Sequence, residues 1–143
     1  MSENLFQNVI VTHAQLNRLR AILVHPENLP LWDDEITQVV PATDGEVQLT
    51  RRSPALNERE WVTVAATASQ VIYHSHGGRL AYDLVFTLTG DATQTSLTEE
   101  LQVTHTTAIP IPLQLLAPIA KQAFAQKLQA LIVLAESSRE VFA

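Results

Sequence analysis

The sequence contains no cysteine, which excludes disulfide bonds, thiolate metal ligands and cysteine nucleophiles. It has only four glycines, two of them in the pair Gly77-Gly78, so a glycine-rich loop for a dinucleotide or a phosphate is excluded. A Gly-x-Ser-x-Gly nucleophile motif is also missing, which removes support for a serine hydrolase. We therefore expect no cofactor.

Basic residues are scarce as well. Nine Lys and Arg stand against fifteen Asp and Glu, and the formal net charge of −6 would repel a phosphate backbone. We therefore expect no nucleic-acid partner. No apolar run approaches the ~20 residues of a membrane-spanning helix, and the start Met1-Ser2-Glu3-Asn4 does not resemble a signal peptide. These features predict a cytoplasmic protein without a transmembrane segment.

What the sequence does contain is enough apolar material for one core. With 143 residues and 46% hydrophobic content, we expect a single domain over residues 1–143. Strand formers fill residues 5–11, and Thr12 is a candidate cap for the helix that follows, which should end near His25. Pro26 favours a second short helix, closed by Trp32, which should pack both helices against the sheet.

From residue 35 onward the apolar residues alternate with a period of two. The predicted strands cover residues 35–40, 46–53, 60–68, 70–76, 79–89 and 95–105. Because short turns join them, they should form an antiparallel meander. In the fifth, Tyr82, Leu84 and Phe86 point to one face; in the last, Leu101 and Val103 share a face with Glu99 and His105.

The last quarter of the chain predicts one long amphipathic helix. The run Ile109-Pro110-Ile111-Pro112 introduces it, as a stiff connector or as an apolar lip over a cavity entrance. An apolar stripe then recurs at spacings of three and four residues, and includes Leu116, Ala120, Phe124 and Leu128. Pro118 is costly inside a helix, so we expect the regular helix to begin there, after a separate turn or a kinked start over residues 113–116, with a bend near Pro118.

A strand, two short helices, antiparallel strands and a long last helix make this chain resemble the START and Bet v 1-like superfamily of polyketide cyclases and lipid-transport proteins. The local matches are residues 22–32, which end in Pro30-Leu31-Trp32, and the passages 115–119 and 131–136. The resemblance implies an α+β helix-grip fold, in which a curved antiparallel sheet wraps around the C-terminal helix. It also implies a hydrophobic cavity, which in relatives holds lipids, sterols, polyketides or plant hormones.

The preferred hypothesis is binding of a hydrophobic small molecule, such as a lipid, a sterol or a polyketide-like compound, between the sheet and the last helix. Burial of apolar surface would supply most of the affinity. The oligomeric state stays open. The residues expected to line the site are Tyr82, Leu84, Phe86, Glu99, Leu101, Val103, Leu116, Ala120, Phe124 and Leu128.

An enzyme is the first alternative. A polyketide cyclase or dehydratase could use Glu99, Tyr82 and His105 as acid, base or orienting groups, because burial would disfavour a charged carboxylate. The competing interpretation pairs Glu99 with Arg51 or Arg79 at a cavity mouth.

Two further alternatives need other features of the chain. His74, His76 and His105 invite a metal site, which we do not favour because His74 and His76 precede the Gly77-Gly78 turn, where exposed polar side chains are expected. The other alternative is a module with a filled core, in which an exposed patch near Trp32 or the proline lip binds another protein.

Overall fold

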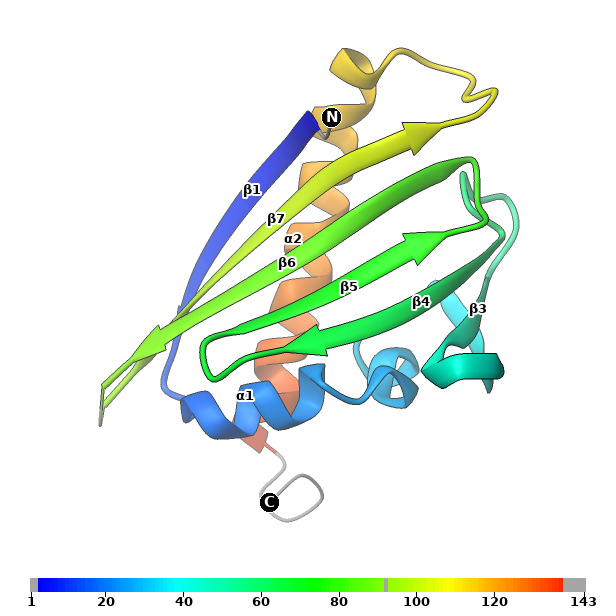
Figure 1. The fold of residues 1–143 in the computed structure, drawn as a ribbon. Coiled ribbons are helices and arrows are strands. Elements are labelled where there is room, and N and C mark those ends of the chain that lie inside the picture. Colours follow the sequence, from blue (N-terminus) through cyan, green and yellow to red (C-terminus); the bar gives the residue numbers. More distant parts are fainter. Residues whose placement is uncertain (1–2, 92, 138–143) are drawn as a thin grey trace.

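The computed structural model describes residues 3–91 and 93–137, which form one curved antiparallel sheet and a long helix against it (Figure 1). The predicted α+β helix-grip fold is confirmed. In chain order the elements are β1 (Glu3–Thr12), α1 (Leu16–Leu23), η1 (Pro26–Leu31), β2 (Ile36–Pro41), η2 (Thr43–Gly45), β3 (Val47–Arg51), β4 (Arg59–Ala66), β5 (Gln70–His76), β6 (Leu80–Gly90), β7 (Thr95–Thr106) and α2 (Leu113–Ser137). Residues 138–143, over which the last helix was predicted to continue, lie outside the described ranges.

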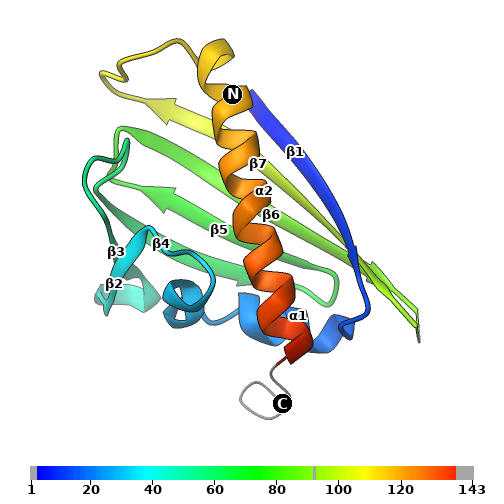
Figure 2. The same ribbon diagram turned by 180° about the vertical axis from the view of Figure 1, so that it is seen from behind.

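The sheet has the strand order β1-β7-β6-β5-β4-β3-β2, with every neighbouring pair antiparallel. Strands β2 to β7 form the predicted meander, and β1 returns to pair with β7. The alternation predicted in β6 is observed, since Leu80, Tyr82, Leu84, Phe86 and Leu88 are all buried. Helix α2 lies diagonally across this side of the sheet, and α1 crosses behind the last turns of α2 in this view (Figure 2).

Helix α2 differs from the prediction at its start. It begins at Leu113 and runs through Pro118, so a separate turn before that proline is not found. Pro118 cannot donate to the carbonyl of Gln114, one turn earlier. Both residues are exposed, so water can satisfy that carbonyl instead.

The two halves of α2 pack differently. Leu128, Leu131 and Ala135 in the second half are buried, whereas Leu116 and Ala120 in the first half are only half-buried. Close packing therefore fills the space under one end of the helix and leaves room under the other.

Thr12 does not cap α1, contrary to the prediction. The helix starts only at Leu16, and its N-cap residue, Gln15, makes no capping hydrogen bond with its side chain. The Thr12 hydroxyl instead accepts from the Ala14 N–H at 3.0 Å and donates to Glu136 Oε2 at 2.6 Å. Thr12 thus joins the end of β1 to the end of α2.

Trp32 lies where the sequence predicts it, between the short helices and the sheet. Its ring is buried and meets Phe86 of β6 edge-on, with ring centroids 6.3 Å apart. The second ring against Phe86 is Tyr73 of β5, whose hydroxyl donates to the Leu23 carbonyl at the end of α1 at 2.5 Å. These three rings fix α1 and η1 on the sheet.

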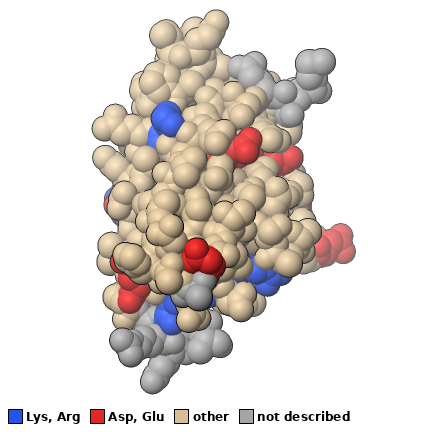
Figure 3. All heavy atoms as spheres, turned by 90° about the vertical axis from the view of Figure 1, so that its left-hand side faces the viewer, with Lys and Arg blue, Asp and Glu red and all other residues tan. Residues whose placement is uncertain are grey.

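The molecular surface on the β1 side carries few charges (Figure 3). Val9 and Val11 on this edge strand are among the most exposed large hydrophobic residues.

Within the described ranges, no helix combines the length and the apolar composition that crossing a membrane requires.

Candidate ligand-binding site

A cleft of about 260 Å³ opens between the first half of α2 and the sheet, where the helix is only half-buried. Its walls are formed by side chains from α2, β1, β3, β6 and β7, from the loop between β3 and β4, and from the segment between η1 and β2. Its lining residues are Leu5, Glu35, Arg51, Pro54, Ala55, Leu56, Asn57, Leu80, Tyr82, Leu101, Leu116, Ala120, Phe124 and Lys127. The wall is mostly apolar, with the charged groups gathered where Arg51 and Lys127 approach it.

A second, much smaller cavity of about 20 Å³ lies deeper and is lined by Trp32, Asp33, Tyr82, Leu84, Glu99 and several apolar residues. Arg51, Tyr82, Phe124 and Lys127 line both spaces, so the two are neighbours. We refer to them as the outer cleft and the inner cavity. The inner cavity has room for about one water-sized group.

The predicted lining residues divide among these spaces. Tyr82, Leu101, Leu116, Ala120 and Phe124 line the outer cleft, and Leu84 and Glu99 line the inner cavity with Tyr82 and Phe124. The remaining three, Phe86, Val103 and Leu128, are buried but line neither space. Phe86 instead fills the core between Trp32 and Tyr73.

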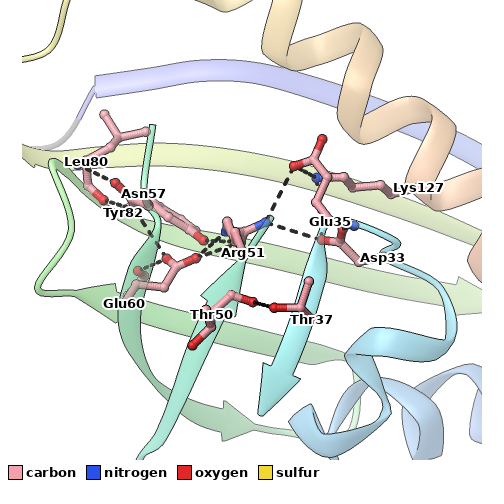
Figure 4. Close-up of polar contacts among 11 residues, drawn as sticks. Asp33, Glu35, Thr37, Thr50, Arg51, Asn57, Glu60, Leu80, Tyr82 and Lys127 are labelled. Atoms are coloured by element: carbon pink, nitrogen blue, oxygen red, sulfur yellow. Dashed lines mark hydrogen bonds and ion pairs between the residues drawn. The ribbon is translucent and has the colours of Figure 1, made fainter. Parts of the chain in front are cut away.

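A buried ion pair forms part of the wall. Arg51 Nε donates to Glu60 Oε1 at 2.7 Å, and Arg51 Nη2 donates to the Tyr82 hydroxyl at 3.3 Å (Figure 4). Glu60 is fully buried, and its other oxygen accepts from the Ser75 hydroxyl and from Asn57 Nδ2 at 3.4 Å. A carboxylate so enclosed is stable as an anion only because each oxygen has a charged or polar donor.

Lys127 of α2 reaches the same group of charges. Its Nζ lies 3.4 Å from Asp33 Oδ2 and 3.1 Å from Glu35 Oε1. Asp33 Oδ2 also lies 3.5 Å from Arg51 Nη1, so Asp33 connects the two cations (Figure 4). The Lys127 ammonium further lies 4.8 Å from the centre of the Phe124 ring.

These contacts set the protonation states. Burial alone would raise the pKa of Glu60, but the Arg51 charge and the hydrogen bonds from Ser75, Tyr82 and Arg51 hold that pKa below its ordinary value. Burial, together with the charge of Glu60, raises the pKa of Tyr82. Glu60 is therefore an anion at neutral pH, and Tyr82 a neutral hydroxyl.

Glu99 has a different environment. It is 0% exposed, and its Oε1 accepts from Asn8 Nδ2 at 3.3 Å, while Oε2 has no hydrogen-bond partner among the described residues. Burial raises the pKa of Glu99 to about 8, despite the opposing effects of Asn8 and Lys127. The predicted ion pair with Arg51 or Arg79 is not found in the described part of the chain, because Arg51 is held by Glu60 and Asp33.

His105 is not near Glu99, contrary to the prediction that both share the inward face of β7. The register of β6 and β7 shifts between Ala81 and Tyr82, so the alternation that places Val103 inward does not continue to His105. His105 is exposed, and its Nε2 lies 3.3 Å from the Thr107 hydroxyl. Glu99 and Tyr82 also have separate polar partners, so the three candidate catalytic residues do not form one hydrogen-bonded group.

The histidines of β5 are paired with carboxylates. His74 Nδ1 lies 2.8 Å from Asp83 Oδ1, and His76 Nε2 lies 2.5 Å from Glu46 Oε2. Across residues 3–91 and 93–137, no three or more His, Asp or Glu side chains are grouped as metal ligands would be.

Sequence reasoning missed most of the buried charges, namely Asp33, Glu60 and Lys127 with Arg51. One signal for Glu60 was present. In β4 it shares the inward side with Val62, so a carboxylate stands at an apolar position of the alternation. Nothing comparable marks Lys127, which is buried among neighbours that are distant in sequence.

Comparison with solved structures finds close likeness in fold and little in sequence. A START superfamily protein from Mycobacterium smegmatis superposes with a TM-score of 0.75 at 17% identity, covering 92% of this chain and 96% of that one. A conserved protein from Geobacillus kaustophilus gives 0.71 at 14% identity, covering 96% of this chain and 97% of its own. An uncharacterised protein from Bacillus thuringiensis gives 0.72 at 8% identity, covering 92% of this chain and 98% of its own. No protein-family model and no curated protein sequence matches the chain.

The chain therefore has a START/Bet v 1-like fold, as its resemblance to that superfamily predicted. At these identities the likeness extends to the fold alone, and the site must be argued from its own residues.

Proposed function

We propose that the protein binds a hydrophobic small molecule of about one or two rings, or a short chain of similar volume, in the outer cleft. The observation that carries this proposal is the cleft of about 260 Å³ under the half-buried part of α2, with its mostly apolar wall. A dry apolar cavity of about 150 Å³ already accepts benzene, so this volume suits a substituted single ring. Larger lipids or sterols would require the helix to move.

The energetics are sufficient for useful affinity. Removing about 300 Å² of apolar ligand surface from water contributes ~7.5 kcal/mol at ~25 cal/mol per Å², before the cost of association. An open cleft also supports a binding protein over a partner-binding module with a filled core. The cyclase or dehydratase alternative loses support because His105, Tyr82 and Glu99 are not connected by hydrogen bonds.

The test is calorimetric titration with 4-propylphenol, using variants that fill one hollow at a time. Ala120→Trp places an indole in the outer cleft, and binding should weaken at least tenfold. Ala130→Trp is the matched control on the same helix, because Ala130 lines neither the outer cleft nor the inner cavity but a neighbouring hollow of about 280 Å³ with Pro30, Leu31 and Trp32. Equal effects of the two variants, or no binding by the wild type, would contradict the proposal.

A further inference from the structure

Two polar atoms without partners belong to residues that line the inner cavity. Among the described residues, Trp32 Nε1 and Glu99 Oε2 are both buried without a hydrogen-bond partner. Trp32 and Glu99 both line the inner cavity of about 20 Å³. Buried polar groups are satisfied in nearly all folded proteins, so each of these two atoms needs a partner that the chain does not supply, either a water molecule or an atom of a ligand.

The size of the inner cavity limits that group. About 20 Å³ holds roughly one water-sized group. A phosphate or a sugar is too large for a space of this size. A hydroxyl or a carbonyl oxygen would fit, and either accepts a hydrogen bond from the Trp32 indole N–H.

The surrounding charges oppose an ionised group. Arg51 and Lys127 line the inner cavity, but Glu60, Asp33 and Glu35 already neutralise them. An anionic head group would therefore find no uncompensated cation, and it would add a fourth negative charge to three carboxylates.

Glu99 is arranged to meet a neutral oxygen. Asn8 donates to its Oε1 and to the Lys121 carbonyl at 3.1 Å, while Lys121 Nζ lies 3.1 Å from Asn8 Oδ1. This chain of contacts holds the carboxyl group between β1 and α2. With a pKa of about 8, Glu99 is largely protonated at neutral pH and can donate as well as accept.

We propose that the ligand places one uncharged oxygen, a hydroxyl or a carbonyl, in the inner cavity that Trp32 and Glu99 line, while its apolar body fills the outer cleft. Because four residues line both spaces, the two spaces adjoin, and a ligand that occupies both would lie against these four side chains. The inference rests on the proposed function and adds the chemical class of the ligand: a small amphiphile with an uncharged oxygen head group.

The experiment compares three probes that share one body: 4-propylphenol, propylbenzene without a head group, and 4-propylbenzoate with an anionic one. Their dissociation constants are measured by calorimetry at pH 7 on the wild type, Glu99→Leu and Glu100→Leu. Glu100 is the matched control because it neighbours Glu99 in β7 but lines neither space. Circular dichroism checks that each variant is folded, and Glu99→Gln, which keeps a polar amide, serves as a second variant.

In the wild type, 4-propylphenol should bind at least tenfold more tightly than 4-propylbenzoate. Glu99→Leu should weaken 4-propylphenol about tenfold and leave propylbenzene unchanged or tighter, Glu99→Gln should keep most of the phenol affinity, and Glu100→Leu should change neither probe. If Glu99→Leu changes the dissociation constants of 4-propylphenol and propylbenzene equally, the head-group assignment is overturned while the binding function stands. The same holds if the wild type binds 4-propylbenzoate as tightly as 4-propylphenol. If none of the probes binds the wild type, the proposed function itself fails.

Discussion

Arg51 on β3 and Glu60 on β4 form a buried ion pair, with Nε and Oε1 2.7 Å apart. The Arg51 side chain is 11% exposed and that of Glu60 is 0% exposed, so water compensates neither charge well. The pair lies beside the outer cleft and links the β3 and β4 half of the sheet to Tyr82 on β6.

Arg51→Met should lower the free energy of unfolding by about 3 to 5 kcal/mol, because it leaves the Glu60 carboxylate buried without its cation. The double variant Arg51→Met/Glu60→Gln should be more stable than the sum of the two single effects, since no uncompensated charge remains. Urea unfolding measures both. Arg59→Met, at an exposed position of β4, is the control and should change stability by less than about 0.5 kcal/mol. If the changes in the free energy of unfolding of the two single variants simply add up in the double variant, Arg51 and Glu60 have no coupling energy.

Glu99 should make stability fall with increasing pH. Its pKa is raised from 4.5 to about 8 in the folded protein, so between these values the folded state holds a proton that the unfolded state has lost. The contribution is fully present below about pH 4.5 and declines by roughly 1.4 kcal/mol per pH unit until about pH 8. Lys127 lowers this pKa and Asp33 raises it, so the two charges shift the pH at which the decline ends.

Glu99→Gln should remove this decline. Urea unfolding at pH 5, 6, 7, 8 and 9 measures it, because the difference in the free energy of unfolding between the wild type and the variant should change with pH. Glu100→Gln is the control and should follow the wild-type curve. Parallel curves for the wild type and Glu99→Gln would mean that Glu99 is ionised at ordinary pH in the folded protein.

Replacing Phe86 by Leu should mainly lower stability, whereas replacing Phe124 by Leu should mainly lower the affinity for 4-propylphenol. Phe86 is fully buried between two other rings, so Phe86→Leu should cost roughly 1 to 2 kcal/mol of stability and leave 4-propylphenol affinity within about twofold. Phe124 is half-buried and lines both spaces, so Phe124→Leu should weaken the probe severalfold with a smaller loss of stability. The reverse pattern would place the ligand elsewhere.

Tyr73→Phe tests how α1 is attached to the sheet. The hydroxyl of Tyr73 donates to the Leu23 carbonyl at 2.5 Å, and its removal leaves that carbonyl without this partner. We expect a loss of roughly 1 to 3 kcal/mol in thermal or urea unfolding. Because Tyr73 lines the inner cavity but not the outer cleft, propylbenzene affinity should stay unchanged, and a loss there would contradict the assignment.

Local patterns in the sequence predicted the fold well. Strand alternation in β6, the proline that opens η1 and the apolar stripe of α2 each depend on neighbours within a few residues, so they can be read directly from the chain. The same reasoning placed Glu99 on an apolar face, and it is buried there. It failed for Thr12, whose hydroxyl meets Glu136, 124 residues away in sequence.

The site depended more on long-range packing. His105 continues the alternation of β7 in sequence, but a register shift against β6 ends that alternation before it. Phe86 points inward as predicted. The rings of Trp32 and Tyr73 pack against it, however, and it lines neither the outer cleft nor the inner cavity. The alternating pattern predicts on which face of the sheet a side chain lies. Whether that side chain reaches a cavity depends on the side chains that pack beside it.

The sequence by itself determined a curved antiparallel sheet with a long helix across it, because the periods of strands and helices are local properties of the chain. Only the tertiary structure decided that α2 packs closely at one end and leaves a cleft at the other. It alone also decided that Lys127 meets Asp33 and that Glu99 lies beside a space for one small polar group. These outcomes depend on the relative positions of groups up to about a hundred residues apart, which no local pattern specifies.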